Sequence, residues 1–439
     1  MCIAHAACAD DDTSLSARFQ QWIGNTDPTH EDWSLHGQAT EIVQGYPGFP
    51  ASYSGANSLS SSDQVRNSTT ATLFLGRRLW EGAAVYMDRE LYEGIGLSDT
   101  YGIAGFPNGE ANKAGSWSIK TNDARLFVRQ VIGLGGHTEQ IAPDQNQLAD
   151  VEDISRVTLT AGKFAANDIF DNNSYSHDAR SQFLNWALID SGAWDYPANS
   201  RGYNNGAVIE LNQEKWALRY GIFMEPYTAN SSDFVWHGLT NAGQVAELEE
   251  RYTIDKNPGK IRLLLFFNSN REAYLSDVLG AADVNAALLA ARHYGNDKYG
   301  FAINAEQQLT DGIGAFARPS WNDGITESWM FTEIDESVSG GLSISGKLWG
   351  RPDDTWGIAG MVNGLSSNER KFFEEGGYGI LIGDGNLSYA PETIFESYYA
   401  FKINQYMTFS PDYQFVLNPA YNADRGPVNI FAGRLHLEF

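Results

Sequence analysis

The sequence predicts an all-β protein, a closed antiparallel transmembrane β-barrel of about 16 strands with short periplasmic turns and long extracellular loops containing short helices. Three observations lead to this prediction. Apolar and polar residues alternate along most of the 439-residue chain, short turn sequences alternate with long polar segments, and apolar runs are short, such as Leu263–Phe267. Alternation gives a strand one apolar and one polar face, whereas a membrane helix needs about 20 apolar residues in a row.

The composition further narrows the class of protein to which the chain can belong. Thirty basic residues against 55 acidic ones give a formal charge of −25, which argues against nucleic acid as a partner because phosphates attract basic surfaces. Only 19% of the residues are charged, 13% are aromatic and 44 are glycines. This composition does not suit a disordered chain.

The N-terminus favours export. Ala7-Cys8-Ala9 fits a small-x-small cleavage pattern, with Asp10 as the first mature residue. An ordinary N-terminus is the alternative, and a lipoprotein site at Cys8 is disfavoured because His5 stands where an aliphatic residue is expected. The predicted organisation is a possible signal-peptide remnant at 1–9, an N-terminal periplasmic segment with a short helix at 10–32, and a single transmembrane barrel at 33–439.

Strand positions follow from the period of two. In 428–439, Leu435 and Leu437 share one face while Arg434 and His436 share the other. The same alternation predicts strands at 35–45, 68–78, 83–92, 123–133, 154–165, 205–212, 215–224, 243–252, 259–269, 299–308, 313–321, 333–349, 354–363, 393–403, 406–416 and 428–439.

Turns and loops alternate between the strands. Short Gly, Asn, Asp and Pro sequences, such as 255–259, predict hairpins. Long polar segments separate the hairpins, and those at 93–122, 166–204 and 364–392 are long enough to fold inward. Helices are predicted at 13–25, 180–191 and 271–291. One long segment, 134–153, falls on the short-turn side by parity, which suggests an error in a strand boundary there.

Charged residues on the polar strand faces are the candidate site. They are either an ordinary wetted face or a constriction whose opposed charges bind substrate. Arginines outnumber lysines by 20 to 10, and the arginine fork can donate to neutral hydroxyls. The candidate lumen residues are Arg78, Asp88, Glu90, Arg125, Arg129, Arg219, Arg262, Glu396 and Arg434.

Aromatic residues are abundant, with 21 tyrosines and 12 tryptophans. Most are expected in girdles at the membrane interface or in loop packing. A minority is expected to line the pore, where ring faces pack against sugars.

Motifs for catalysis are missing from the sequence. The eight histidines show no HExxH spacing, no GxSxG sequence occurs, and no GKS or GKT follows the glycines at 376–379. Cys2 and Cys8 are the only cysteines, so they form no disulfide framework or cysteine zinc site in the body of the chain. The sequence therefore predicts no enzyme activity, no cofactor and no metal.

Four segments resemble the OprB-type family of carbohydrate-selective outer-membrane porins. They are QGYPGFPASYSGANSL (44–59), QFLNWALIDSGAWDYPAN (182–199), TEIDESVSGGLSISGKLWGRPDDTWGIAG (332–360) and GDGNLSYAPETIFESYY (383–399). The resemblance implies a sixteen-stranded barrel that lets mono- or small oligosaccharides diffuse across the outer membrane of a Gram-negative bacterium. It also implies that charged wall residues narrow the lumen.

Partners and rival interpretations follow from the same pattern. The expected partners are a carbohydrate substrate, outer-membrane lipid and the barrel-assembly machinery, which would recognise the strand ending at Phe439; the chain is a monomer or a homotrimer. Rivals are a non-selective porin, a barrel enzyme such as a lipase, a surface adhesin and a soluble carbohydrate-binding β-sandwich. An energised receptor needs about 22 strands and a plug domain, for which the chain has no room.

Overall fold

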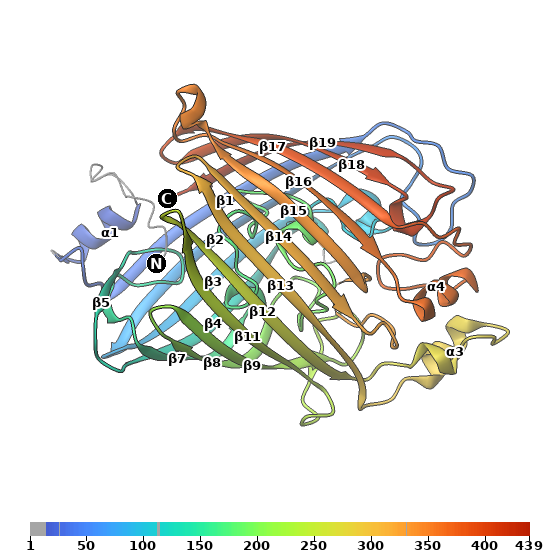
Figure 1. Cartoon of the computed structure of the whole chain (residues 1–439), viewed down its shortest axis with the longest axis horizontal. Coiled ribbons are helices and arrows are strands. Elements are labelled where there is room, and N and C mark those ends of the chain that lie inside the picture. Colours follow the sequence, from blue (N-terminus) through green and yellow to red (C-terminus); the bar gives the residue numbers. More distant parts are fainter. Residues whose placement is uncertain (1–14, 26, 112–114, 331) are drawn as a thin grey trace.

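The protein is a closed antiparallel β-barrel (Figure 1). The computed structural model describes residues 15–25, 27–111, 115–330 and 332–439. Its main sheet has 17 strands, of which β10 is a two-residue segment at Phe234–Val235, so 16 long strands form the wall. The barrel closes because β1 pairs with both β2 and β19, with Gln38 opposite Glu438 in the second pairing. The predicted fold class is confirmed.

Each of the sixteen predicted strands coincides with a long strand of the wall. The wall strands are β1 Trp33–Tyr46, β2 Gln64–Trp80, β3 Ala83–Gly94, β4 Ser116–Gly133, β7 Arg156–Phe164, β8 Asn204–Asn212, β9 Trp216–Pro226, β11 Ala242–Ile254, β12 Asn257–Asn270, β13 Asn296–Thr310, β14 Ile313–Asn322, β15 Glu336–Ser345, β16 Thr355–Gly364, β17 Glu392–Asn404, β18 Met407–Leu417 and β19 Val428–Glu438.

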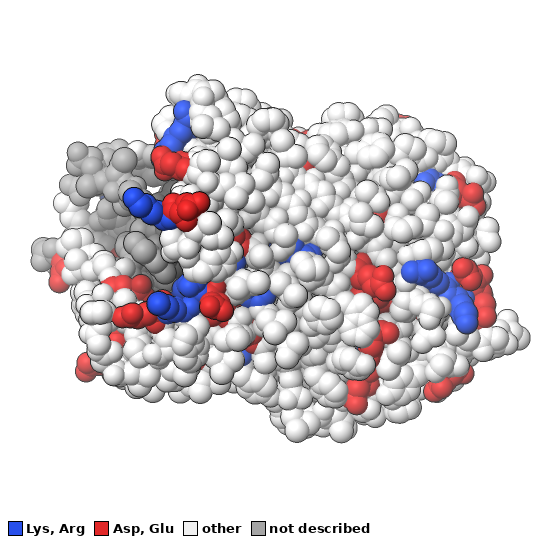
Figure 2. Space-filling model, in the orientation of Figure 1, with Lys and Arg blue, Asp and Glu red and all other residues white. Residues whose placement is uncertain are grey.

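Burial along the strands follows the alternation. On β12, Ile261, Leu263 and Leu265 point outward and are 41–52% exposed, whereas Arg262 and Leu264 point inward and are 1–2% exposed. An outward apolar face and an inward polar face are what a barrel in lipid requires. The face of the barrel seen in Figure 2 is mostly uncharged, with groups of charged residues near both ends.

Short turns join the strands at one end of the barrel, here called the turn end, and long loops join them at the other, the loop end (Figure 1). The turn between β11 and β12 is tight because Asp255 and Lys256 both adopt positive φ. The segment 134–153 does lie at the turn end. It forms its own hairpin of β5 (Thr138–Ile141) and β6 (Asp150–Asp153), so the strand boundaries around it were right.

The helices are short. α1 (Leu15–Trp22) lies within the predicted 13–25 helix, and α4 (Ser367–Glu374) lies in a loop. The prediction for 180–191 was wrong in extent, because only α2 (Trp186–Ile189) is helical and Asn185 caps its start. The prediction for 271–291 was also too long: α3 spans Val284–Ala291 and begins after its N-cap Asp283.

No helix in the described part of the chain is long and apolar enough to cross a membrane. The proposed signal remnant at 1–9, with Cys2 and Cys8, lies outside the described residues.

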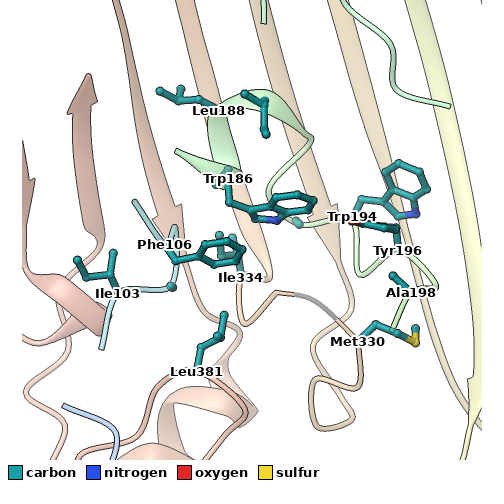
Figure 3. Packing of buried hydrophobic residues seen from close by; sticks show 14 of the residues in the cluster. Ile103, Phe106, Trp186, Leu188, Trp194, Tyr196, Ala198, Met330, Ile334 and Leu381 are labelled. Carbon is teal, nitrogen blue, oxygen red and sulfur yellow. The ribbon is translucent and has the colours of Figure 1, made fainter. Parts of the chain in front are cut away.

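Loops fill the loop end of the barrel. The segment 165–203 packs inside the wall, and parts of 95–111, 323–335 and 365–391 pack against it. Figure 3 shows the resulting apolar cluster, in which the Phe106 and Trp186 rings stack at 5.5 Å. Trp186 also stacks on Tyr196 at 5.4 Å. Of the three loops that the sequence shows to be long enough to fold inward, 166–204 packs inside the wall, and this loop positions the candidate site.

Candidate functional site

Wall residues on β17 and β19 hold the inserted loop 165–203. The buried carboxylate of Glu396 accepts the backbone N–H groups of Leu184 and Asn185, the latter at 3.0 Å. The Arg434 guanidinium donates to the carbonyl oxygens of Ala179 and Gln182 at 2.7 and 2.6 Å. Both wall residues were predicted to line the lumen. They do point inward, but they bind loop backbone.

Arg125 of β4 links the wall to the loop. Its guanidinium bonds Asp88 of β3 at 3.1 Å and Asp168 of the loop at 2.5 and 2.7 Å. Burial alone would raise the pKa of Asp168, but the charge and hydrogen bonds of Arg125 outweigh it and hold that pKa below its usual value. The Asp168 carboxylate therefore stays ionised at neutral pH, which fixes a negative charge beside the arginine.

Glu90 of β3 is the centre of a second charge cluster. It bonds Arg201 at 2.9 Å and Arg180 at 3.4 Å, both from the inserted loop, and accepts the Tyr203 hydroxyl at 3.2 Å. Arg180 also bonds Glu110 of the neighbouring loop at 3.0 Å. In the two clusters taken together, charged side chains from β3, from β4 and from the loops 95–111 and 165–203 thus converge.

These clusters surround a cavity of about 580 Å³, here called the eyelet cavity. This volume lies within the ~300–1,000 Å³ range of small-molecule sites. Its lining combines both signs of charge with aromatic rings. Lining residues include Glu110, Arg125, Asp168, Asp178, Arg180, Trp186, Tyr196, Arg201 and Tyr203.

A larger cavity of about 900 Å³, here called the vestibule, lies toward the turn end. Arg129, Gln147 and Asp168 line both cavities, so the two adjoin. Arg129 donates to the Asn146 carbonyl at 3.0 Å, and its guanidinium lies 5.2 Å from the Tyr86 ring centre.

The tip of the β5–β6 hairpin enters the barrel beside Arg129. Asn146 donates to Asp88 at 2.9 Å, and Leu148 is buried. Arg78 of β2 bonds Asp150, where the tip loop of this hairpin ends, at 2.6 Å, and donates to the Glu31 carbonyl at 2.9 and 3.0 Å. The hairpin therefore narrows the turn end of the lumen.

A ladder of ion pairs covers another part of the vestibule wall. Arg219 of β9 bonds Glu247 at 2.7 Å. Arg262 of β12 bonds Glu249 at 2.8 Å and Glu306 at 3.3 Å. Predicted lumen residues thus fall into three groups. Asp88, Glu90, Arg125 and Arg129 form the charge clusters beside the inserted loop and the hairpin tip, and Arg219 and Arg262 form this ladder. The other three anchor segments to the wall, Glu396 and Arg434 the inserted loop and Arg78 the hairpin.

Sequence reasoning missed the half of the site that comes from loops. Asp168, Arg180 and Arg201 lie in a segment without periodicity, so alternation could not assign them a direction. The signal available was the segment's length together with its two arginines. Among the described residues, no group of three or more His, Cys, Asp or Glu side chains could hold a metal ion.

A closed sixteen-stranded barrel with a charged, loop-narrowed lumen defines a channel of the porin class. Comparison with known families gives the same result. The family model of the carbohydrate-selective porins, OprB family, matches residues 56–439, and the chain belongs to this family. The family that the four segments resemble is therefore confirmed.

Individual relatives are distant. Porin AaxA of Chlamydia muridarum is 22% identical over 328 residues, which are 71% of this chain and 61% of that protein. Porin AaxA of Chlamydia trachomatis serovar A is 23% identical over 64% of this chain and 52% of its own length. The chain thus spans about half to three fifths of the curated relatives it matches.

Solved structures share the fold. The high-pH structure of Pseudomonas putida OprB superposes with a TM-score of 0.71 at 17% identity, covering 95% of this chain and 97% of that one. Salmonella typhi OmpF, solved in complex with daunomycin, gives a TM-score of 0.50 at 11% identity, covering 94% and 98%.

Proposed function

We propose that this chain is an outer-membrane porin through which mono- or small oligosaccharides diffuse down their gradients, together with water and ions. The observation that carries this proposal is the eyelet cavity, in which fixed arginines and carboxylates face a space of about 580 Å³ inside the barrel. Membership of a carbohydrate-selective family supports it.

The chemistry of the eyelet cavity suits neutral, hydroxyl-rich solutes. Arg125 and Arg180 offer planar sets of N–H donors, and Asp168 and Asp178 offer carboxylate acceptors. A sugar hydroxyl can therefore accept a hydrogen bond from an arginine and donate one to a carboxylate. These groups are already hydrogen-bonded within the protein, Arg125 to Asp168, Arg180 to Glu110 and Asp178 to the Ser181 hydroxyl. A sugar therefore competes for hydrogen bonds instead of gaining new ones outright, and it binds weakly enough to leave.

The same proposal includes the orientation of the barrel in the membrane and the partners of the chain. The barrel wall at 33–439 forms one domain in the outer membrane of a Gram-negative bacterium, with the turn end and the segment 10–32 in the periplasm. Outward apolar residues contact lipid, and the assembly machinery recognises β19 (Val428–Glu438). Diffusion through such a pore needs no cofactor and no catalytic group.

Liposome swelling tests the proposal. Vesicles containing the refolded protein should swell faster in glucose or maltose than in polyols of matched size that lack a ring. Equal swelling rates for all solutes of one size would contradict the proposal and indicate a non-selective porin. A folded barrel without solute flux would favour the enzyme or adhesin alternative.

A further inference from the structure

The turn between β15 and β16 projects from the barrel at the turn end. Nine residues, 346–354, separate these two strands, whereas only two residues, 311–312, separate β13 from β14. The turn begins with a 3₁₀ helix, η4 (Gly346–Trp349). In Figure 1 this turn, coloured orange, stands out from the side of the barrel. It therefore extends beyond the wall where the shorter turn does not.

Backbone hydrogen bonds give the turn a fixed shape. Gly346 donates to the Asp354 carbonyl at 2.8 Å, and Arg351 donates to the Gly346 carbonyl at 2.9 Å. Gly350 ends the 3₁₀ helix with a φ of 82°, a conformation that glycine adopts without strain. The projection is therefore a folded element, and the side chains that it carries have defined positions.

Trp349 holds the turn against the outer face of the wall. Tyr399 of β17 points outward, because its neighbours Tyr398 and Ala400 are buried on the inward face. The Trp349 indole N–H donates to the Tyr399 hydroxyl at 2.7 Å, and the two ring centres lie 5.9 Å apart. Tyr399 in turn donates to the buried Asp354 carboxylate at 2.8 Å. The turn therefore lies on the side of the wall that faces away from the lumen.

Other outward aromatic residues lie at the same level of the wall. Trp356 of β16 pairs with Tyr399 across the two strands, and Trp356 and Phe401 of β17 are both 39% exposed. Aromatic side chains gather on membrane barrels where the hydrocarbon meets the lipid headgroups. The turn 346–354 therefore leaves the wall at the level of the headgroups.

The exposed side chains of the turn combine apolar and cationic groups. Leu348 and Trp349 are 61% and 41% exposed. The side chains of Lys347 and Arg351, on either side of them in the chain, are 53% and 51% exposed. A phospholipid presents acyl chains and a charged phosphate next to each other, and this combination of side chains is complementary to it.

Lys347 is the cation that is free to bind a headgroup. Arg351 bonds the buried Asp354 carboxylate through two of its nitrogens, one of them at 3.1 Å, and this pair belongs to the fold of the turn. Lys347 lies 3.5 Å from Asp311, whose side chain is 92% exposed. An ion pair so exposed contributes little to stability. A lipid phosphate can therefore take the place of the Asp311 carboxylate.

We propose that the turn 346–354 inserts into the periplasmic leaflet of the membrane and binds the headgroup of an anionic phospholipid, an inference that rests on the proposed orientation of the barrel. Leu348 and Trp349 lie among the upper parts of the acyl chains. Lys347 bonds the lipid phosphate, and the positive charge of Arg351 adds to the attraction. The bound lipid fixes the depth of this side of the barrel in the membrane.

The depth of Leu348 in a bilayer tests the insertion. In a background with Cys2→Ser and Cys8→Ser, a spin label is attached to Leu348→Cys and, as the matched control, to Lys256→Cys in the exposed turn between β11 and β12. Power saturation compares collisions with oxygen, which concentrates in lipid, and with a nickel chelate, which stays in water. Oxygen should dominate for Leu348→Cys and nickel for Lys256→Cys. A label on Leu348→Cys that nickel reaches as readily as the control overturns the proposal.

Native mass spectrometry tests the headgroup. The folded protein is offered equal amounts of phosphatidylglycerol and phosphatidylcholine in mild detergent. The wild type should retain more phosphatidylglycerol, and Lys347→Gln should reduce this preference several-fold while Lys256→Gln leaves it unchanged. Equal retention of the two lipids by the wild type, or a preference that Lys347→Gln leaves intact, overturns the proposal.

This proposal and the proposed function fail in different experiments. A barrel that passes no sugar contradicts the proposed function, but the label on Leu348→Cys still reports lipid. In intact cells, a maleimide coupled to a large polyethylene glycol should not reach Lys256→Cys, because the turn end is in the periplasm. Labelling there would reverse the orientation of the barrel and overturn the periplasmic phospholipid as the ligand.

Discussion

The carboxylate of Glu396 accepts the backbone N–H of Asn185 at 3.0 Å, although the two residues are 211 positions apart. Asn185 in turn donates to the Gly105 carbonyl at 2.7 Å and to the Gln414 side chain at 3.1 Å. One buried asparagine thus connects the barrel wall with two loops. This network fixes the inserted loop, and with it the shape of the eyelet cavity.

Glu396→Ala should release the inserted loop while leaving the barrel closed. Two buried backbone N–H groups lose their acceptor, at a cost of about 1–3 kcal/mol each. Single-channel conductance should rise and block by sugar should weaken. Ser397→Ala, on the outward face of the same strand, is the matched control and should behave like the wild type. Unchanged conductance in Glu396→Ala would mean that other contacts hold the loop.

Arg125→Ala should make the pore more cation-selective. The substitution removes the cation that pairs with Asp88 and Asp168 and leaves two carboxylates beside the eyelet cavity. The reversal potential in a salt gradient measures this change, and sugar flux in liposome swelling should fall several-fold. Arg77→Ala, at the outward turn-end rim, is the control. An unaltered reversal potential would remove Arg125 from the constriction.

Arg129→Ala should act differently from Arg125→Ala. Arg129 donates to a neutral carbonyl of the hairpin tip and lies where the two cavities adjoin. Its loss therefore widens this junction without leaving a bonded carboxylate unpaired. We expect a larger conductance with a smaller change in selectivity than for Arg125→Ala. Equal shifts in selectivity for the two variants would contradict the separate roles.

Asp168→Asn should destabilise the protein more at neutral pH than in acid. Because Arg125 holds the folded-state pKa of Asp168 below its usual 3.8, the pairing stabilises the fold above about pH 4 and is lost as pH falls through the lowered pKa. The expected difference in unfolding free energy from the wild type is about 2 kcal/mol at pH 7. Urea unfolding in detergent at pH 7 and at a series of acidic pH values measures it, and a difference that does not shrink as the pH falls below about 4 would contradict this origin.

The alternation of apolar and polar residues predicted the strands of the wall well, because each strand contacts lipid on one face and a polar lumen on the other. The pattern at 259–269 or 428–439 records these two environments directly. It carries no information about segments that contact both wall and solvent. The hairpin at 138–153 shows this: its tip residue Asn146 reaches Asp88, yet nothing in its sequence places it inside the barrel.

The site was predicted only in part for the same reason. Asp88, Glu90 and Arg125 were found because their strands alternate. Their partners Arg180 and Arg201 come from a loop whose path depends on contacts with distant residues such as Glu396. Local sequence does not encode those contacts. The inward-pointing residues of the wall could therefore be predicted from the sequence, whereas the loop residues inside the barrel could not.

Conductance across a planar lipid bilayer tests the central claim most directly. The refolded protein should open stepwise channels whose current falls as glucose or a maltooligosaccharide is added, with a half-blocking concentration that Arg125→Ala raises. Channels that are indifferent to every sugar, from a barrel shown to be folded by its gel mobility, would contradict a saccharide-binding eyelet.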